Sequence, residues 1–244
     1  MWVLAFLAAS LLAAAPPAPV LVELFTSEGC SSCPPADELL SRLENTQPAP
    51  GVEIIALSEH VDYWNHQGWA DPFSSPAFSA RQQQYGSRFR KEVFTPQMVV
   101  DGGAELVGSD GRRALAAILE AARTPKARVG LSCSAADPQP KLQVRIEGIP
   151  MSGESDVFLA ITESGLRSRV SSGENAGRTM PHGSVVRRLD TIGRARQPSF
   201  AAESRLAVKK SWKRGNLAAV VFVQERASRH VLGAGRITLP VCAL

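Results

Sequence analysis

Two cysteines separated by two residues, Cys30 and Cys33, are the part of this sequence best suited to chemistry. The apolar segment Val20–Phe25 before them predicts a buried strand, and Pro34–Leu43 after them predicts an amphipathic helix. A C-x-x-C motif at this junction places its first sulfur at a helix N-terminus, where unpaired N–H groups and the helix dipole favour a thiolate. We therefore expect a redox pair in which Cys30, at the exposed end of the loop, is the nucleophile and the more buried Cys33 resolves the mixed disulfide.

Two other interpretations of this motif stay open. In the first, Cys30 and Cys33 form a stable structural disulfide in a non-catalytic binding protein. In the second, the two thiolates and the imidazole of His60 form a soft ligand set that suits copper(I) or zinc. We expect no resident metal and no cofactor, so copper binding is an alternative function.

A loop rich in aromatic residues follows a second predicted strand, Val52–Leu57. The carboxyl ends of parallel strands meet at one edge of a sheet, so this loop should lie close to the C-x-x-C motif. We expect His60, Trp64 and Trp69 to contribute to a substrate pocket over Cys30, although a lid packed on its own domain would explain them equally well. The nearby acids Glu23 and Glu28 are expected to be ordinary strand and loop residues.

The N-terminal residues resemble a secretory signal peptide. An apolar segment of about a dozen residues is followed by Ala13–Ala15, an A-x-A cleavage site, and then by two prolines. We expect residues 1–18 to be removed, no integral membrane span to remain, and the mature protein to be periplasmic or secreted. In such an oxidising compartment disulfides persist, and the four cysteines pair naturally as Cys30–Cys33 and Cys133–Cys242.

The two halves of the chain differ in pattern and charge. Residues 1–126 carry 9 basic and 14 acidic residues, whereas residues 127–244 carry 18 basic and 9 acidic ones. Helices and strands are predicted to alternate in the first half, with a strand entered through Pro96, a hairpin turn at Asp101–Gly103 and a last helix capped near Asp110. Short alternating segments in the second half predict strands alone. The basic residues are scattered and no nucleic-acid motif accompanies them, so we expect no nucleic-acid partner.

The first half resembles the thioredoxin fold, on the strand, the C-x-x-C motif, the helix and the later Thr95-Pro96. The sequence from Val22 to Asp37, His60–Trp64 and the segment Thr95–Gly102 also resemble a thioredoxin-like family of secreted bacterial proteins, the domain of unknown function 1223. The segment Gly173–Arg178 with His182 is similar to that family too, and we expect its polar residues to brace a loop.

This resemblance implies a thioredoxin-like α/β domain at residues 19–124, followed by an all-β, sandwich-like domain at residues 127–242. It implies that Pro96 is a cis-proline packed against the disulfide and that Thr95 contacts an extended substrate. The expected function is thiol–disulfide exchange on protein thiols or disulfides, with Cys30, Cys33 and Pro96 as catalytic residues. The oligomeric state stays open.

Overall fold

The computed structural model describes residues 16–134, 141–150 and 152–239. Three helices lie in the first half: α1 (Pro34–Thr46), α2 (Pro76–Phe89) and α3 (Gly111–Ala121). The first four strands are β1 (Ala18–Thr26), β2 (Val52–His60), β3 (Gln97–Val100) and β4 (Ala104–Val107). The remaining elements are β5 (Arg128–Ser134), β6 (Lys141–Glu147), β7 (Ser155–Glu163), β8 (Leu166–Arg169), β9 (Thr179–His182), β10 (Val185–Ala195), β11 (Ser199–Arg205), the 3-10 turn η1 (Arg214–Asn216), β12 (Leu217–Glu225) and β13 (Val231–Thr238).

The expected elements of the first half are confirmed. Strand β1 pairs in parallel with β2 and antiparallel with β3, and β4 forms the edge of the sheet. The cap expected near Asp110 is present, because its carboxylate accepts a hydrogen bond from the N–H of Arg113. Helix α2 is capped by Ser75, whose hydroxyl accepts a hydrogen bond from the N–H of Ala77. The main difference is that β2 continues through His60, which places that histidine at the end of a strand instead of in the loop.

The expected fold class is wrong. An eight-stranded mixed sheet, in the order β13-β12-β7-β10-β2-β1-β3-β4, runs through both halves of the chain, so no thioredoxin-like domain is followed by a separate all-β one. The join lies between β2 and β10, where Val185 pairs with Ser58 and the N–H of Ser58 donates to the carbonyl of Ser184. Strand β10 thereby pairs the edge that β2 would otherwise expose. Such a pairing between distant residues leaves no local trace in a sequence.

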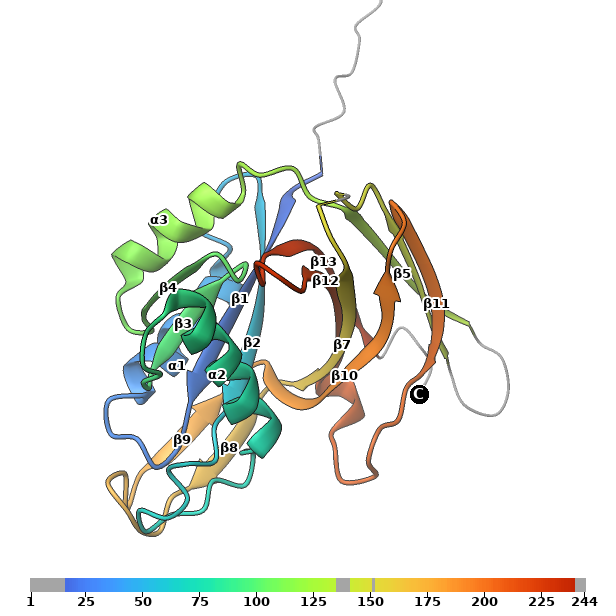
Figure 1. Cartoon of the computed structure of the whole chain (residues 1–244). Coiled ribbons are helices and arrows are strands. Elements are labelled where there is room, and N and C mark those ends of the chain that lie inside the picture. The colour runs from blue at the N-terminus through green and yellow to red at the C-terminus, as the bar shows by residue number, and fades with distance from the viewer. Residues whose placement is uncertain (1–15, 135–140, 151, 240–244) are drawn as a thin grey trace, which may run out of the picture.

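Helices cover both faces of the sheet at the β1–β4 end (Figure 1). One face packs against the apolar sides of α1 and α3, among them Leu39, Leu40 and Ile118. On the opposite face, Phe78 and Tyr85 of α2 are buried, and Phe78 joins a core that also contains Phe222 of β12. This core therefore draws on both halves of the chain.

A second, three-stranded sheet of order β11-β6-β5 packs on the other end of the molecule. Leu142, Val144 and Ile146 alternate along β6 and point into a core shared with Val157, Leu159 and Val221 of the large sheet. Strands β8 and β9 form a small separate hairpin that carries His182. No helix in the described part of the chain has the length and apolar character needed to cross a bilayer.

Candidate functional site

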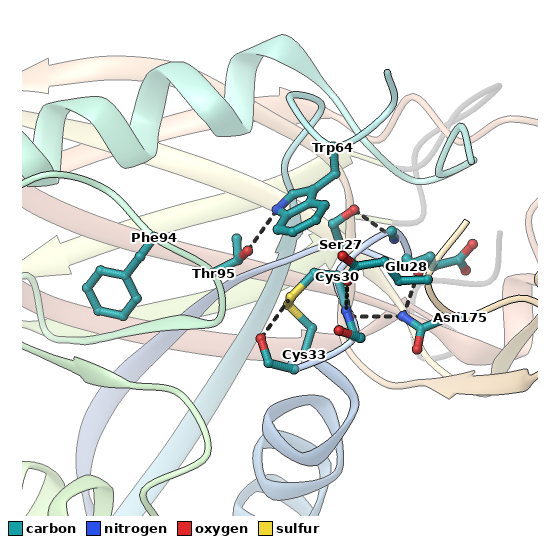
Figure 2. Close-up of a disulfide and its surroundings, with 12 residues drawn as sticks. Ser27, Glu28, Cys30, Cys33, Trp64, Phe94, Thr95 and Asn175 are labelled. Carbon is teal, nitrogen blue, oxygen red and sulfur yellow. Dashed lines mark hydrogen bonds between the residues drawn. A yellow bond between two sulfur atoms is a disulfide. The ribbon is translucent and has the colours of Figure 1, made fainter. Parts of the chain in front are cut away.

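The disulfide between Cys30 and Cys33, expected from the sequence, is present (Figure 2). It closes the turn between β1 and α1, and Cys33 is the residue that immediately precedes the helix. The turn is held by backbone hydrogen bonds from Cys30 to Ser27 and from Cys33 to Cys30. The disulfide therefore lies at the N-terminus of α1, where we predicted it from the local sequence.

The exposure of the two sulfurs differs from the expectation. We expected Cys30 to be accessible, yet the Cys30 residue is 1% exposed and Cys33 is fully buried. Only Ser31 and Ser32 between them are exposed, and the Ser32 hydroxyl lies 3.3 Å from the Cys30 sulfur. In this conformation a partner would meet the serine backbone before it could reach either sulfur.

Trp64 covers one side of the disulfide turn (Figure 2). Its indole Nε1 donates a 2.8 Å hydrogen bond to the hydroxyl of Thr95. A Cβ atom placed on Gly29 would lie 3.1 Å from the Cβ of Trp64, so the turn and the tryptophan are in close contact. The aromatic loop thus reaches the motif, and Trp64 and Thr95 are the predicted substrate-binding residues nearest to it.

Pro96 is buried beside the first turn of α1, and the Thr95–Pro96 peptide bond is cis. A Cβ atom on Gly108 would lie within 3.2 Å of both Ala36 and Pro96, which shows that these two residues flank the same glycine. Ala36 is three residues after Cys33. Pro96 therefore lies close to the first turn of α1, the helix that Cys33 precedes.

A segment from the second half of the chain holds the other side of the turn. The side-chain amide of Asn175 donates 2.9 Å hydrogen bonds to the carbonyls of both Glu28 and Cys30. Arg178 donates to the amide oxygen of Asn175 and thereby fixes the orientation of this amide. The carboxylate of Glu174 accepts a 2.9 Å hydrogen bond from the N–H of Ser31. Our expectation that this polar cluster braces a loop is met, and the loop is the C-x-x-C turn itself.

Beneath the turn lies a buried network of two acid–histidine pairs. Glu28 is in contact with Nε2 of His182 at 2.8 Å and accepts a 2.8 Å hydrogen bond from Nε1 of Trp69. Nδ1 of His60 lies 2.7 Å from Asp71, whose carboxylate also accepts the N–H of Glu28. His60 and Trp69 therefore support the turn from below instead of lining a pocket above Cys30.

The electrostatics of the His60–Asp71 pair favour the charged forms of both groups. Burial alone would lower the pKa of His60, but the neighbouring Asp71 carboxylate raises this pKa above its ordinary value. Burial alone would raise the pKa of Asp71, whereas His60 and the N–H of Glu28 bring it below its ordinary value. The pair behaves as a buried ion pair that anchors the loop after β2.

Asp37 is a buried acid that none of the sequence motifs predicted. It lies on the buried side of α1, among Ala36, Leu39 and Leu40, and neither carboxylate oxygen makes a hydrogen bond among the described residues. Burial raises the pKa of Asp37 to about 6, against the lowering influence of His60 and His182. An acid within an apolar helix face is the signal that could have identified it, because such a residue is costly to bury.

Glu23 is occupied elsewhere. Its carboxylate lies 2.5 Å from the guanidinium of buried Arg81 and accepts a hydrogen bond from Tyr85. The guanidinium carbon of Arg81 in turn lies 5.2 Å from the ring centroids of both Phe158 and Phe222. Glu23 is therefore not the ordinary strand acid that we expected: it is fully buried and pairs with a buried arginine in the core.

Within the described residues, no group of three or more histidine, cysteine, aspartate or glutamate side chains is arranged to hold a metal ion. His60 is engaged by Asp71, and both thiols of the motif are consumed in the disulfide. The copper-binding alternative therefore has no preformed site in this oxidised form. The expected Cys133–Cys242 bond involves Cys242, which lies outside the described residues, as do residues 1–15 of the predicted signal peptide.

Two solved structures are similar in fold to this chain. The chain is 27% identical to protein AGR_C_4864 from Agrobacterium tumefaciens, whose crystal structure superposes with a TM-score of 0.71 over 92% of this chain and 96% of that one. HBP35 of Porphyromonas gingivalis shares 15% identity with a TM-score of 0.64, over 93% of this chain and 76% of that one, and shows likeness of fold alone. No curated protein sequence gives a significant match.

A family model described as a protein of unknown function, DUF1223, matches residues 21–224. The matched region begins in β1 and ends in β12, so it includes the disulfide turn, the Trp64 loop and the Asn175 segment. The resemblance to the domain of unknown function 1223 is thereby confirmed, and the chain belongs to the DUF1223 family.

Proposed function

We propose that this protein carries out thiol–disulfide exchange on protein thiols or disulfides, with Cys30 and Cys33 as the reacting pair. The observation that carries the proposal is the disulfide at the N-terminus of α1, beneath the exposed turn formed by Ser31 and Ser32. A bond in this position closes a loop of only two residues, so it adds little to the stability of the chain as a cross-link. Reactivity explains its placement better.

The proposed exchange consists of two successive thiol–disulfide exchange reactions. A partner thiolate attacks Sγ of Cys30, the bond between Cys30 and Cys33 breaks, and Cys33 leaves as a thiolate that takes up a proton. A second partner thiolate then attacks the partner sulfur of the mixed disulfide and releases Cys30, so two electrons pass from partner to protein. The reverse sequence reduces a partner disulfide. We propose that Thr95 and Pro96, beside the turn, contact the partner chain.

Burial of Cys30 means that a covering group moves before the first attack. Trp64 is the group most free to do so, because its indole is only partly buried and one side-chain hydrogen bond holds it. The N-terminal sequence pattern supports a periplasmic or secreted location, where partners with disulfides are available.

One structural feature favours a second candidate function, a binding protein with an inert disulfide. Both sulfurs are inaccessible, and hydrogen bonds from Asn175 and Glu174 reinforce the closed turn. Under this alternative the pair would not exchange with any protein thiol.

A trapping experiment separates the two functions. A background variant with Cys133→Ser and Cys242→Ser leaves only the pair at α1, so every thiol signal belongs to it. With an unfolded dithiol protein as substrate, the oxidised background protein should exchange. With the disulfide form of the same substrate, an added Cys33→Ser should accumulate a mixed disulfide, because the Cys30 thiolate attacks the substrate disulfide, one substrate sulfur leaves as a thiolate, and no Cys33 is present to resolve the product. An added Cys30→Ser should be inactive. If the background protein keeps its disulfide intact under these conditions, the exchange function is wrong and the binding function stands.

A further inference from the structure

Few N–H groups at the start of α1 are available to donate a hydrogen bond to a thiolate. Such groups ordinarily stabilise a cysteine thiolate at a helix N-terminus. Here the first two helical residues are Pro34 and Pro35, which have no N–H group. The N–H of Cys33 donates to the carbonyl of Cys30, and the N–H of Ser31 donates to Glu174. Ser32 alone in this run keeps an N–H that makes no hydrogen bond among the described residues.

The charge next to Cys30 also disfavours a thiolate at this residue. The helix dipole contributes roughly half a positive charge at its N-terminus, whereas the Glu174 carboxylate brings a full negative one to the residue next to Cys30. The hydrogen bond from Ser31 lowers the pKa of Glu174, so this carboxylate is ionised at neutral pH. No lysine or arginine is hydrogen-bonded to the turn among the described residues.

We propose that Glu174 disfavours the Cys30 thiolate, and that the reduced pair is for this reason an electron donor to partner disulfides instead of an acceptor of electrons from partner thiols. This inference rests on the exchange function proposed above. It gives that function a direction and assigns Glu174, from the distant second half of the chain, as a positioning and tuning residue of the site.

The physical link is the stability of the reduced state. A low-pKa thiolate stabilises the dithiol form and makes a disulfide oxidising, whereas a destabilised thiolate makes the same pair reducing. The Cys30 thiol then attacks a partner disulfide, Cys33 attacks the resulting mixed disulfide, and the partner leaves as a dithiol with two electrons and two protons. A low-potential dithiol donor is needed to regenerate the reduced pair.

The decisive measurement is the equilibrium of Cys30–Cys33 with glutathione, in the background that lacks Cys133 and Cys242. Glu174→Gln should shift this equilibrium toward the reduced form by about threefold to tenfold, where tenfold corresponds to about 30 mV. The effect is modest because Glu174 is exposed and its charge is screened. Thiolate absorbance should show a lowered Cys30 pKa in the same variant. Glu174→Asp, which keeps the charge, should retain most of the original equilibrium.

Glu120→Gln is the matched control. It removes one exposed carboxylate from α3, where Glu120 forms an ion pair with Arg123, so it should leave the equilibrium unchanged. The inference is overturned if Glu174→Gln leaves both the equilibrium and the Cys30 pKa unaltered, or shifts the pair toward the oxidised form.

The direction is tested separately with insulin as a disulfide substrate and a reduced peptide dithiol as the opposite one. The reduced protein should cleave the insulin disulfides faster than the oxidised protein oxidises the peptide. If oxidation of the peptide is faster, the direction is wrong while exchange itself stands. If neither reaction occurs, the exchange function fails, and the glutathione equilibrium still decides the role of Glu174.

Discussion

Asn175 donates its side-chain amide to the carbonyl of Cys30 across 145 residues of sequence. The same amide nitrogen also donates to the carbonyl of Glu28, so one side chain holds two residues on the N-terminal side of the disulfide turn. The disulfide and the side chains that hold its turn thus come from opposite halves of the chain.

Loss of the Asn175 amide should loosen the turn. Asn175→Ala leaves the carbonyl of Glu28 without this donor and the carbonyl of Cys30 with one donor fewer, which should lower the free energy of unfolding by about 1–3 kcal/mol. Reduction of the disulfide by dithiothreitol should become faster. Asn216→Ala is the control, because the side-chain amide of Asn216 donates a comparable hydrogen bond to the carbonyl of Ser164, far from the disulfide. Equal reduction rates for both variants would contradict this role.

Trp64 should limit access to Cys30. In Trp64→Ala the cover over the turn is lost, and if opening becomes easier by about 1.4 kcal/mol, reduction by dithiothreitol accelerates about tenfold. Trp64→Phe keeps an aromatic ring but loses the hydrogen bond to Thr95, so its disulfide should be reduced faster than that of the original protein and more slowly than that of Trp64→Ala. Rates that are the same in all three proteins would show that access is controlled elsewhere.

Asp37 should make the protein less stable as the pH rises. Burial raises its pKa from 3.8 to about 6, so the stabilising contribution of the neutral acid is complete below pH 3.8 and is lost as the pH rises through 6. Asp37→Asn should therefore gain stability relative to the original protein, by up to about 3 kcal/mol at pH 8, and little at pH 4. Urea unfolding at the two pH values measures this. Glu38→Gln, an exposed neighbour on the same helix, should show no such pH dependence.

The His60–Asp71 pair should contribute most in mildly acidic solution. The raised pKa of His60 gives stability that is present below 6.5 and is lost as the pH rises through the folded-state pKa. The lowered pKa of Asp71 gives stability that is present above 3.8 and is lost as the pH falls. Asp71→Asn should therefore cost about 2 kcal/mol between these limits and less at higher pH.

Asp62→Asn is the matched control for this pair. Asp62 lies in the same loop, and its carboxylate accepts a hydrogen bond from the hydroxyl of Ser79 instead of pairing with His60. Unfolding free energies measured from pH 4 to pH 8 should show a pH-dependent difference for the Asp71 variant alone. A constant difference across this range would mean that His60 and Asp71 do not form an ion pair.

The first half should not fold on its own. Leu21, Ile55 and Leu57 of β1 and β2 share a buried core with Val220 and Phe222 of β12, and β10 pairs the outer edge of β2. A fragment of residues 16–126 should therefore lack a cooperative unfolding transition in urea, because that core and that edge are exposed. A fragment that unfolds cooperatively would show that the first half is independent after all.

Local sequence was sufficient for the elements around the disulfide. Alternation and length predicted β1, α1, β2 and the hairpin of β3 and β4, because each depends on neighbouring residues. The cap residue near Asp110 predicted where α3 begins for the same reason. The position of the Cys30–Cys33 pair at a strand-to-helix junction followed from adjacency along the chain, and the nearness of Trp64 to it followed from the common edge of parallel strands. The place of Thr95 was expected only from the family resemblance.

Only the tertiary structure decided how the halves combine and what surrounds the sulfurs. The pairing of β2 with β10, and the hydrogen bonds from Glu174 and Asn175 to the disulfide turn, join residues more than a hundred positions apart. No periodicity encodes such contacts, because they depend on where two distant segments come to lie when their apolar faces are buried together. Burial of Cys30 and the charges around it arise from the same packing, so the reactivity of the pair depends on the fold and not on the motif alone.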